Sequence, residues 1–305
     1  MLKTIINRML QGVLVTFCLL TITFFLVRMM PGDALTNEKA MSPQVRQKNI
    51  EIFHLDKPQT VQYLYYWKNL LSGQMGYSST KDQPVAKIIS QSFPASAMLG
   101  ILGMIIAVCI GIPAGIIAAL KHNSLMDNGA MFVAMLGISV PSFVLGPLFA
   151  IFIATKVPFL KVAGWGDPFD WILPSLTLGL GTAAYLARIT RAGMLDVLSQ
   201  DYIRTAKAKG VSQFSIIRKH ALKGGLIPSI AFLGPAFAML ITGSFVVETI
   251  FQVPGMGQHF VNSAKDRDYF LLQGMVLLFG GLIVIVNLAA DILLAYLNPR
   301  LRDSL

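Results

Sequence analysis

Apolar runs of membrane-spanning length constrain this chain more than any other feature of its sequence. A transmembrane helix needs about 20 consecutive, mainly apolar residues. Only 13% of the 305 residues are charged, whereas about a quarter are charged in soluble domains. The predicted spans are 9–30, 94–120, 130–155, 173–189, 226–251 and 269–297. The sequence therefore predicts an all-α integral membrane protein with six transmembrane helices.

Small residues and prolines inside these spans predict how the helices pack. Gly111 and Gly115 form a small-xxx-small pair, which lets a second helix approach closely. Pro141 and Pro147 interrupt the third span, because proline lacks the N–H that continues a helix. We therefore expect a close helix contact along the second span and a break within the third.

A long segment after the first span, 31–93, contains no apolar run that could cross a membrane. Within it, Pro58 to Leu71 predicts an amphipathic helix. The residues expected to share one face of this helix are Val61, Leu64, Tyr65 and Lys68. We expect the whole segment to lie outside the membrane.

Lysine and arginine in the short loops predict the orientation, because they collect on the cytoplasmic side. One side has eight basic residues in the loop 188–223, and also Lys3, Arg8, Lys121, Arg300 and Arg302. The other side has Lys156, Lys161, Lys265 and Arg267 in its short loops. Segment 31–93 carries seven basic residues, but loops of that length largely escape the rule. Both termini are therefore predicted to be cytoplasmic.

The orientation divides the chain into four predicted parts. Residues 1–30 form an N-terminal transmembrane helix, and 31–93 form an extracytoplasmic segment. Residues 94–297 form a core of five transmembrane helices, and 298–305 form a cytoplasmic tail.

The cytoplasmic stretch Asp201 to Pro228 is strongly basic and lies between two apolar spans. Gly210 separates two predicted helical pieces and supplies the left-handed backbone that a tight helix end needs, with Ser212 as the next N-cap. The apolar stripe expected on the second piece comprises Val211, Phe214, Ile217 and Ala221. Its composition allows two functions: docking in a groove of a cytoplasmic partner, or binding of anionic lipid at the membrane surface.

Motifs for an energy source or for catalysis are missing from the sequence. It contains no phosphate-binding loop, no His-Glu-x-x-His and no Gly-x-Ser-x-Gly, and its basic residues fit cytoplasmic loops better than a nucleic-acid patch. Cys18 and Cys109 lie in apolar runs and predict neither a disulfide nor a metal site. We therefore expect no enzyme and no bound cofactor or metal in this chain; uphill transport would need a partner ATPase or an ion gradient.

An ion-coupled carrier usually keeps ionisable residues at the middle of the bilayer. The predicted spans of this chain contain few ionisable residues. Arg28, Glu248 and Asp291 are the embedded candidates, and all lie nearer to span ends than to centres. Glu248 is either a passage or gate residue, or a carboxylate paired with a neighbouring base.

The basic segment resembles the cytoplasmic loop of binding-protein-dependent ABC importer permeases. The similarity lies in Asp201-Tyr-Ile-Arg-Thr-Ala-Lys-Ala-Lys-Gly210 and Arg218-Lys-His-Ala-Leu222, which are most similar to the dipeptide/oligopeptide/nickel branch and, within it, to the first permease subunit of oligopeptide importers. Further matching motifs are Met30-Pro-Gly-Asp33, Phe93-Pro-Ala-Ser96, Arg188-Ile-Thr-Arg-Ala-Gly-Met-Leu195, Glu248-Thr-Ile-Phe-Gln-Val-Pro-Gly-Met-Gly257, Arg267-Asp-Tyr269 and Asn298-Pro-Arg300. These motifs extend along nearly the whole chain.

The resemblance implies a type I permease core with an ATPase-coupling loop at 190–225. The residues that it assigns to coupling are Asp201, Tyr202, Arg204, Thr205, Ala206, Lys207, Lys209, Gly210, Phe214, Arg218, His220 and Leu222. Arg204 stands where the wider family has a glutamate, and Lys223 stands where it has a proline. Contacts specific to that glutamate are therefore not expected here.

The resemblance also implies partners and a location. A second homologous permease would complete the path, two cytoplasmic ATPase subunits would hold ATP and Mg²⁺, and an extracytoplasmic binding protein would deliver peptide. The chain would lie in the lipid of a bacterial cytoplasmic membrane and bind no nucleic acid. The alternatives are a nickel or metal-chelate permease of the same branch, a secondary carrier, whose inverted repeats and coupling site the sequence lacks, and an intramembrane enzyme, for which no catalytic group is present.

Overall fold

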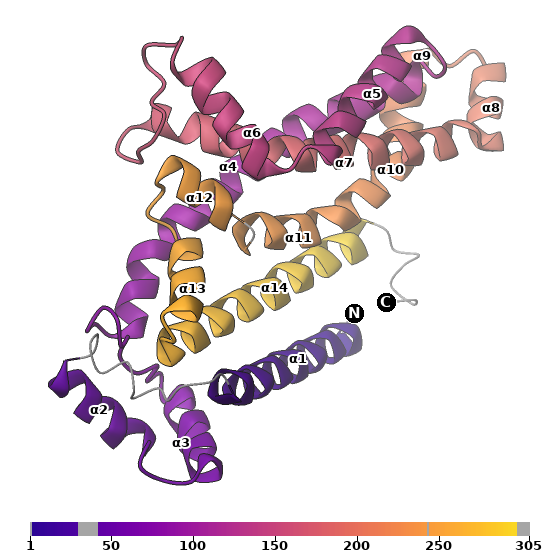
Figure 1. Cartoon of the computed structure of the whole chain (residues 1–305). Coiled ribbons are helices and arrows are strands. Elements are labelled where there is room, and N and C mark those ends of the chain that lie inside the picture. Colours follow the sequence, from indigo (N-terminus) through magenta and orange to yellow (C-terminus); the bar gives the residue numbers. More distant parts are fainter. Residues whose placement is uncertain (1, 30–41, 243, 298–305) are drawn as a thin grey trace. The chain divides into compact units, whose positions relative to one another are not determined.

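The computed structural model describes residues 2–29, 42–242 and 244–297, and within these ranges nearly every regular element is a helix (Figure 1). An isolated bridge between Tyr77 and Pro84 is the β pairing in this part of the chain. The predicted motifs at 30–33 and 298–300 lie outside the described residues.

Four helices are long and apolar enough to cross a membrane. They are α1 (Leu2–Met29), α4 (Val85–Leu120), α7 (Ile172–Leu198, continued from η2, Pro168–Trp171) and α14 (Tyr269–Leu297). Two bent helix pairs raise the number to six if each pair counts as one span. The prediction of a multi-spanning helical protein is thus confirmed, and within the described residues the length and composition of the helices allow four to six spans.

The predicted break in the third span is confirmed. The α5 helix (Leu125–Ser139) ends just before Pro141, and α6 (Ser142–Phe149) continues into the π-helical turn η1 (Ala150–Ala154). The two arms meet at an angle of 102°. The interruption predicted at Pro147 is wrong, since Pro147 lies inside α6, and Pro141 is the proline at which the chain turns.

The predicted fifth span, 226–251, is divided in the structure. The α11 helix (Ile227–Thr242) has 16 residues, which is about 24 Å of helix and less than the roughly 30 Å of a bilayer core. The α12 helix (Phe245–Phe251) follows it, and the segment Gln213–Gly225 precedes it at an angle of 48°. The span therefore depends on bent continuations rather than on one straight helix.

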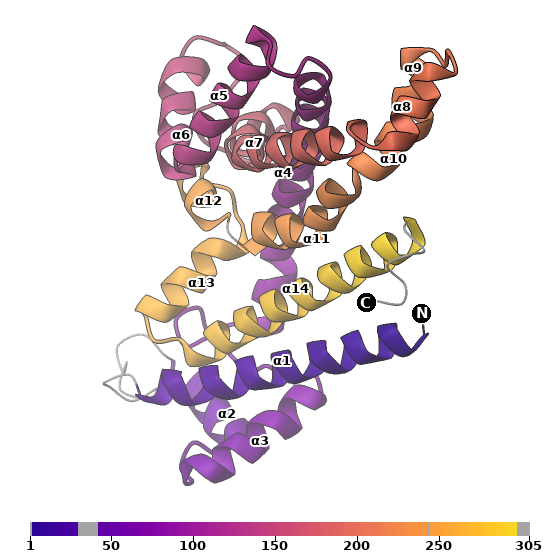
Figure 2. The same ribbon diagram turned by 90° about the vertical axis from the view of Figure 1, so that its right-hand side faces the viewer.

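The chain forms two compact units, and the second combines 6–96 with 254–285. It contains α1, α2 (Pro43–Phe53), α3 (Gln59–Leu71), the start of α4, α13 (Met256–Lys265) and most of α14 (Figure 2). The predicted helix at 58–71 is confirmed as α3, and Leu64, on the face expected from helical spacing, is 68% exposed. Tyr63, Tyr66 and Trp67 pack instead on the phenylalanines of α1, because large aromatic rings bury the most apolar area.

The first unit contains, among the described residues, most of 97–253 together with 2–5 and 286–297. In it α4 and α7 approach closely at glycines: a Cβ atom on Gly111 would lie 2.4 Å from the Ala183 carbonyl oxygen, and one on Gly115 would lie 2.5 Å from that of Ala187. The close contact predicted for the Gly111/Gly115 pair is confirmed. This contact fixes α7, and two residues separate the end of α7 from the basic segment.

Candidate coupling surface

The basic segment folds into four short helical pieces. They are α8 (Asp201–Ala208), α9 (Gln213–Ser215), the π-helical η3 (Ile216–Ala221) and α10 (Leu222–Gly225), and Figure 2 shows them together beyond the end of α7. Gly210 joins the first two with φ +76°, which is the left-handed backbone predicted for it. Ser212 occupies the N-cap position of α9, although its side chain makes no capping hydrogen bond.

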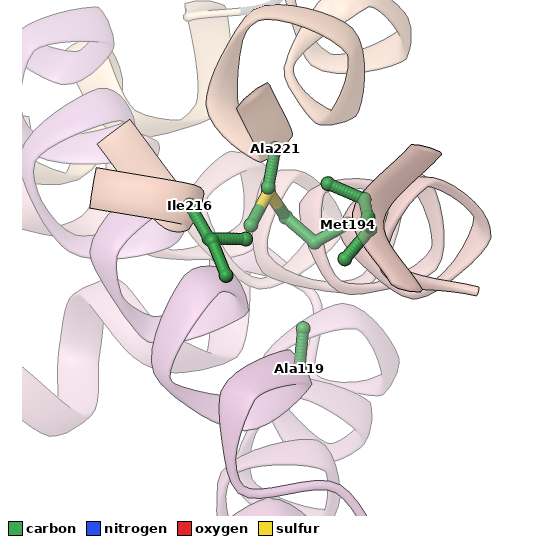
Figure 3. Packing of buried hydrophobic residues seen from close by; sticks show 5 residues of the cluster. Ala119, Met194, Ile216 and Ala221 are labelled. Atoms are coloured by element: carbon green, nitrogen blue, oxygen red, sulfur yellow. The ribbon is translucent and has the colours of Figure 1, made fainter. Parts of the chain in front are cut away.

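One side of the segment is anchored by a small apolar cluster. Ile203, Ile216 and Ala221 are buried against Met194 of α7 and Ala119 of α4. Figure 3 shows the Met194 side chain between Ile216 and Ala221, with Ala119 facing it from α4. The basic segment is therefore packed on two membrane-length helices rather than tethered by a flexible loop.

The predicted apolar stripe on the second piece is partly wrong. Phe214 is 72% exposed, and Ile216 rather than Ile217 reaches the cluster. A π-helix bonds residue i to i+5, so residues five apart, Ile216 and Ala221, share a face. The predicted stripe uses the α-helical spacing of four, which pairs Ile217 with Ala221 and does not apply to a π-helical turn.

The opposite side of the segment is exposed and basic. Phe214 and Tyr202 provide apolar area there, since Tyr202 is 49% exposed. The other predicted coupling residues that are exposed are Asp201, Arg204, Thr205, Lys207, Lys209, Gly210, Arg218 and His220. Ala206 and Leu222 are half-buried against the apolar cluster. Ten of the twelve predicted residues are therefore exposed, and the other two pack against the apolar cluster.

A buried ion pair joins α5 to α7 just before the coupling segment. Arg191 donates to both carboxylate oxygens of Asp127. The distance is 2.6 Å from Nε to Oδ1 and 2.7 Å from Nη2 to Oδ2. The Asp127 side chain is fully buried, and that of Arg191 is 23% exposed. His122 lies 3.1 Å from Arg191 Nη2 through Nδ1, and the Asn123 backbone N–H donates to Asp127. Sequence reasoning missed this pair because the two residues are 64 positions apart.

Close backbone contacts and a hydroxyl pair hold the segment between α7 and the start of α11. A Cβ atom on Gly193 would lie 2.5 Å from the carbonyl oxygen of Gly225. Thr190 and Ser229 hydroxyls are hydrogen-bonded at 2.8 Å. Both Thr190 and Gly193 belong to the motif 188–195, so part of that motif serves to fix α10 on α7.

Glu248, the candidate gate residue, lies on α12 and is fully buried. It accepts a hydrogen bond of 2.5 Å from the Ser244 hydroxyl, one turn earlier. The Ser244 hydroxyl is not the neighbouring base expected for a structural carboxylate, so the pairing with a base and the role as a gate both stay predictions.

Arg28, another of the embedded ionisable residues, lies against aromatic side chains. Its guanidinium carbon lies 3.5 Å from the centre of the Phe24 ring, and its Nε donates to Gln62 of α3. These contacts tie α1 to α3 and give Arg28 a structural role within the second unit.

Asp268 holds a surface hairpin onto the start of α14. The buried carboxylate accepts from the Ser78 hydroxyl at 2.5 Å, from the backbone N–H and hydroxyl of Thr80, and from the backbone N–H of Leu271. The sequence identified Asp268 as part of a motif without indicating what it binds. Its contacts show that the motif residue fixes residues 77–84.

Metal ligands do not cluster in the part of the chain that the structure describes. Within it, no three His, Cys, Asp or Glu side chains are grouped so that they could hold an ion. Cys18 and Cys109 are free thiols there.

These features define a multi-spanning helical membrane protein with an anchored, basic segment at one end of a membrane-length helix. Residues 111–303 match the family described as the binding-protein-dependent transport system inner membrane component. Residues 1–100 match the N-terminal part of such membrane components. The chain belongs to this family of inner-membrane transport subunits.

Curated relatives are similar over the full length of the chain. The oligopeptide transport system permease protein OppB of Haemophilus influenzae is 44% identical, with 99% of this chain and 100% of that protein covered. The dipeptide transport system permease protein DppB of Bacillus subtilis is 41% identical, with 92% of each covered. The glutathione transport system permease protein GsiC of Escherichia coli is 39% identical, with 99% of each covered.

The fold is also found among solved structures. An inward-facing form of the MetNI methionine ABC transporter matches with a TM-score of 0.60 at 16% identity, and covers 69% of this chain and 96% of the other. A second form of that transporter gives a TM-score of 0.57, also at 16% identity, and covers 70% of this chain and 97% of the other. At this identity the similarity concerns the fold alone.

Proposed function

We propose that this chain is a transmembrane permease subunit of an ATP-driven peptide importer and forms half of its translocation path. The observation that carries the proposal is the two-sided coupling segment, which is apolar and anchored on one side and basic and aromatic on the other. Full-length relatives named for oligopeptide, dipeptide and glutathione transport support a peptide substrate.

The exposed side of the segment suits a groove on a cytoplasmic ATPase subunit. A short helix that presents a few apolar side chains inside a basic surround is a common docking element. Phe214 and Tyr202 are the exposed aromatic side chains, with Arg204, Lys207 and Arg218 around them. Basic residues of this kind steer association and set its orientation.

The anchored side of the segment transmits the movement of the partner. Met194 and Ala119 hold the segment to α7 and α4, and the Asp127–Arg191 pair holds α5 to α7. Packed interiors are too dense to absorb a displacement locally. Closure of the ATPases upon ATP would therefore tilt α4, α5 and α7 together and open the path to the outside.

Both termini and the coupling segment would lie in the cytoplasm of a bacterial cell, and 31–93 would lie outside. A second, homologous permease would complete the path, and an extracytoplasmic binding protein would deliver the peptide. ATP and Mg²⁺ would be held by the partner ATPases, with no cofactor on this chain.

Reconstitution of the complete complex in liposomes tests the proposal. With the binding protein outside and ATP at the ATPases, we expect accumulation of a labelled oligopeptide that ceases without ATP. Labelled glutathione and a nickel chelate distinguish the substrates of the branch. Uptake that is driven by an ion gradient in the absence of ATP would contradict the proposal and favour a secondary carrier.

A further inference from the structure

A polar pocket of about 250 Å³ lies within the second unit, away from the coupling segment. It opens between the hairpin 77–84, the second turn of α4 and the first turn of α13. The residues that line it are Lys81, Gln83, Ile88, Gln91, Ser92, Pro254 and His259. The proposed orientation places it on the extracytoplasmic side, where α1 ends and where α4 and α14 begin.

The lining of this pocket offers one full positive charge and several hydrogen-bond donors but no carboxylate. Lys81 supplies the charge, and Gln83, Gln91 and His259 supply side-chain N–H groups. Ser92 is buried and donates its hydroxyl to the Ile88 carbonyl oxygen at 2.8 Å, so it offers lone pairs only. In the described parts of the chain, no ion pair occupies the Lys81 ammonium group.

The histidine in this pocket is a neutral donor near pH 7. Burial, with a smaller contribution from the charge of Lys81, lowers the pKa of His259. A neutral imidazole keeps one N–H, so the pocket contains a single cation with neutral donors around it. Such a set matches one carboxylate group, which takes one charge and several hydrogen bonds.

The walls of the pocket are fixed before any ligand arrives. Asp268 binds the hairpin through Ser78 and Thr80, and the Ser78 N–H donates to the Gln83 carbonyl oxygen at 2.9 Å. On the other wall, the Met256 N–H at the start of α13 donates to Ser96 Oγ of α4 at 2.8 Å. Preorganised walls reduce the entropic cost of binding.

We propose that this pocket binds a carboxylate group of the transported peptide, with Lys81 as the charged contact and Gln91 and His259 as donors. The proposal rests on the proposed function, because a peptide importer handles substrates that each carry a terminal carboxylate. Ligand pockets usually enclose about 300–1,000 Å³, so this smaller one receives the end of a peptide rather than the whole of it. Ile88 and Pro254 offer apolar contact to the last side chain.

Uptake by the reconstituted complex tests this site with two forms of one oligopeptide, one with a free C-terminal carboxylate and one amidated. The variants are Lys81→Gln, which removes the charge, and Lys81→Arg, which keeps it. Lys87→Gln is the matched control, because Lys87 is an exposed lysine near the same end of α4 that does not line the pocket. The same binding protein serves every arm, so its own preference cancels in the comparison.

We expect Lys81→Gln to raise the KM of the free-carboxylate peptide relative to the amidated one by about two- to fivefold, which is the range of a partly exposed ion pair. Lys81→Arg and Lys87→Gln should keep the wild-type ratio. The bound carboxylate could be that of the peptide C-terminus or that of an acidic side chain. A peptide with an amidated C-terminal aspartate offers only the side-chain carboxylate. If Lys81→Gln also raises the KM of this peptide, the pocket accepts a side-chain carboxylate as well.

The proposal would be overturned if Lys81→Gln left the ratio of the two KM values, free-carboxylate to amidated peptide, unchanged. An equal loss for both peptides would also overturn it, because it would indicate a contact with the binding protein instead. If the wild-type complex transports neither peptide, the proposed function fails rather than this site.

Discussion

At the scale of single residues, the Asp127–Arg191 pair is a buried charged contact that joins α5 to α7. A buried carboxylate without its cation keeps the cost of desolvation and loses the compensating attraction. The pair is bidentate, which is the strong geometry for a guanidinium and a carboxylate. It was not predicted, although Arg191 lies in a motif that the sequence singled out.

Arg191→Met should destabilise the protein by about 3–5 kcal/mol, because the buried Asp127 carboxylate then loses its bidentate cation and keeps only the Asn123 backbone N–H and His122 beside it. A lower thermal midpoint in detergent would show the loss. Arg204→Met is the matched control: Arg204 lies 3.6 Å from Asp201 in an exposed pair, and such pairs contribute at most about 1 kcal/mol. Equal effects of the two substitutions would contradict the assignment.

His259 should make stability depend on pH in mildly acidic solution. Burial lowers its pKa in the folded protein below the unfolded value of about 6.5. The unfolded state therefore takes up a proton first as the pH falls through 6.5, and stability is lost in that direction; above 6.5 it is complete. Thermal midpoints between pH 7.5 and 5.5 should fall less for His259→Gln than for the wild type. An identical fall in both would show that His259 does not carry the effect.

At the scale of elements, the fold depends on contacts that tie short surface pieces to long helices. The hairpin 77–84 is held by Asp268, and the coupling segment is held by Met194. The order of both pieces therefore depends on the contacts that they make with the long helices. Local unfolding is expected to begin where such a contact is removed.

Asp268→Ala should free the hairpin without unfolding the long helices. Three hydrogen bonds to Ser78 and Thr80 are lost, and bonds to a charged acceptor contribute about 1.5–3 kcal/mol each. Hydrogen exchange of the amides in 77–84 should accelerate by at least about tenfold. Asp56→Ala is the control, since Asp56 is exposed. Unchanged protection in Asp268→Ala would show that other contacts hold the hairpin.

Sequence patterns predicted some elements well and others poorly, for physical reasons. The left-handed Gly210, the break at Pro141 and the Gly111/Gly115 contact follow from local chain geometry, and the structure confirms them. The packing face of α3 does not follow from its own sequence, because the choice among its apolar residues depends on the partner helix. The stripe near Ile217 was wrong because a π-helical turn changes the spacing.

At the scale of the whole molecule, the sequence gives the class of protein but not the pairs that hold it together. Apolar runs and loop charges need only a local reading. The contact between Asp268 and Ser78 joins residues 190 positions apart, and no pattern in one sequence indicates such a pairing. Motif residues such as Ser96 and Asp268 were identified by resemblance, and their structural roles became visible only in the fold.

We propose that the segment around Gly210 transmits work between an ATPase and the membrane helices. Gly210 has open space around its Cα, and its N–H donates to the Lys207 carbonyl oxygen at 3.0 Å. Gly73 provides a matched control: its φ is +78°, it has open space, and its N–H donates to the Leu70 carbonyl oxygen at 3.0 Å. Proline at either position removes the N–H and opposes the left-handed backbone.

The most direct test is the ratio of peptide taken up to ATP hydrolysed by the reconstituted complex, measured for Gly210→Pro and Gly73→Pro together with ATPase retention in a pull-down. We predict that Gly210→Pro abolishes uptake-coupled hydrolysis and weakens ATPase retention, whereas Gly73→Pro leaves both near the wild-type values. Normal coupling and normal retention of the ATPases in Gly210→Pro would contradict the account.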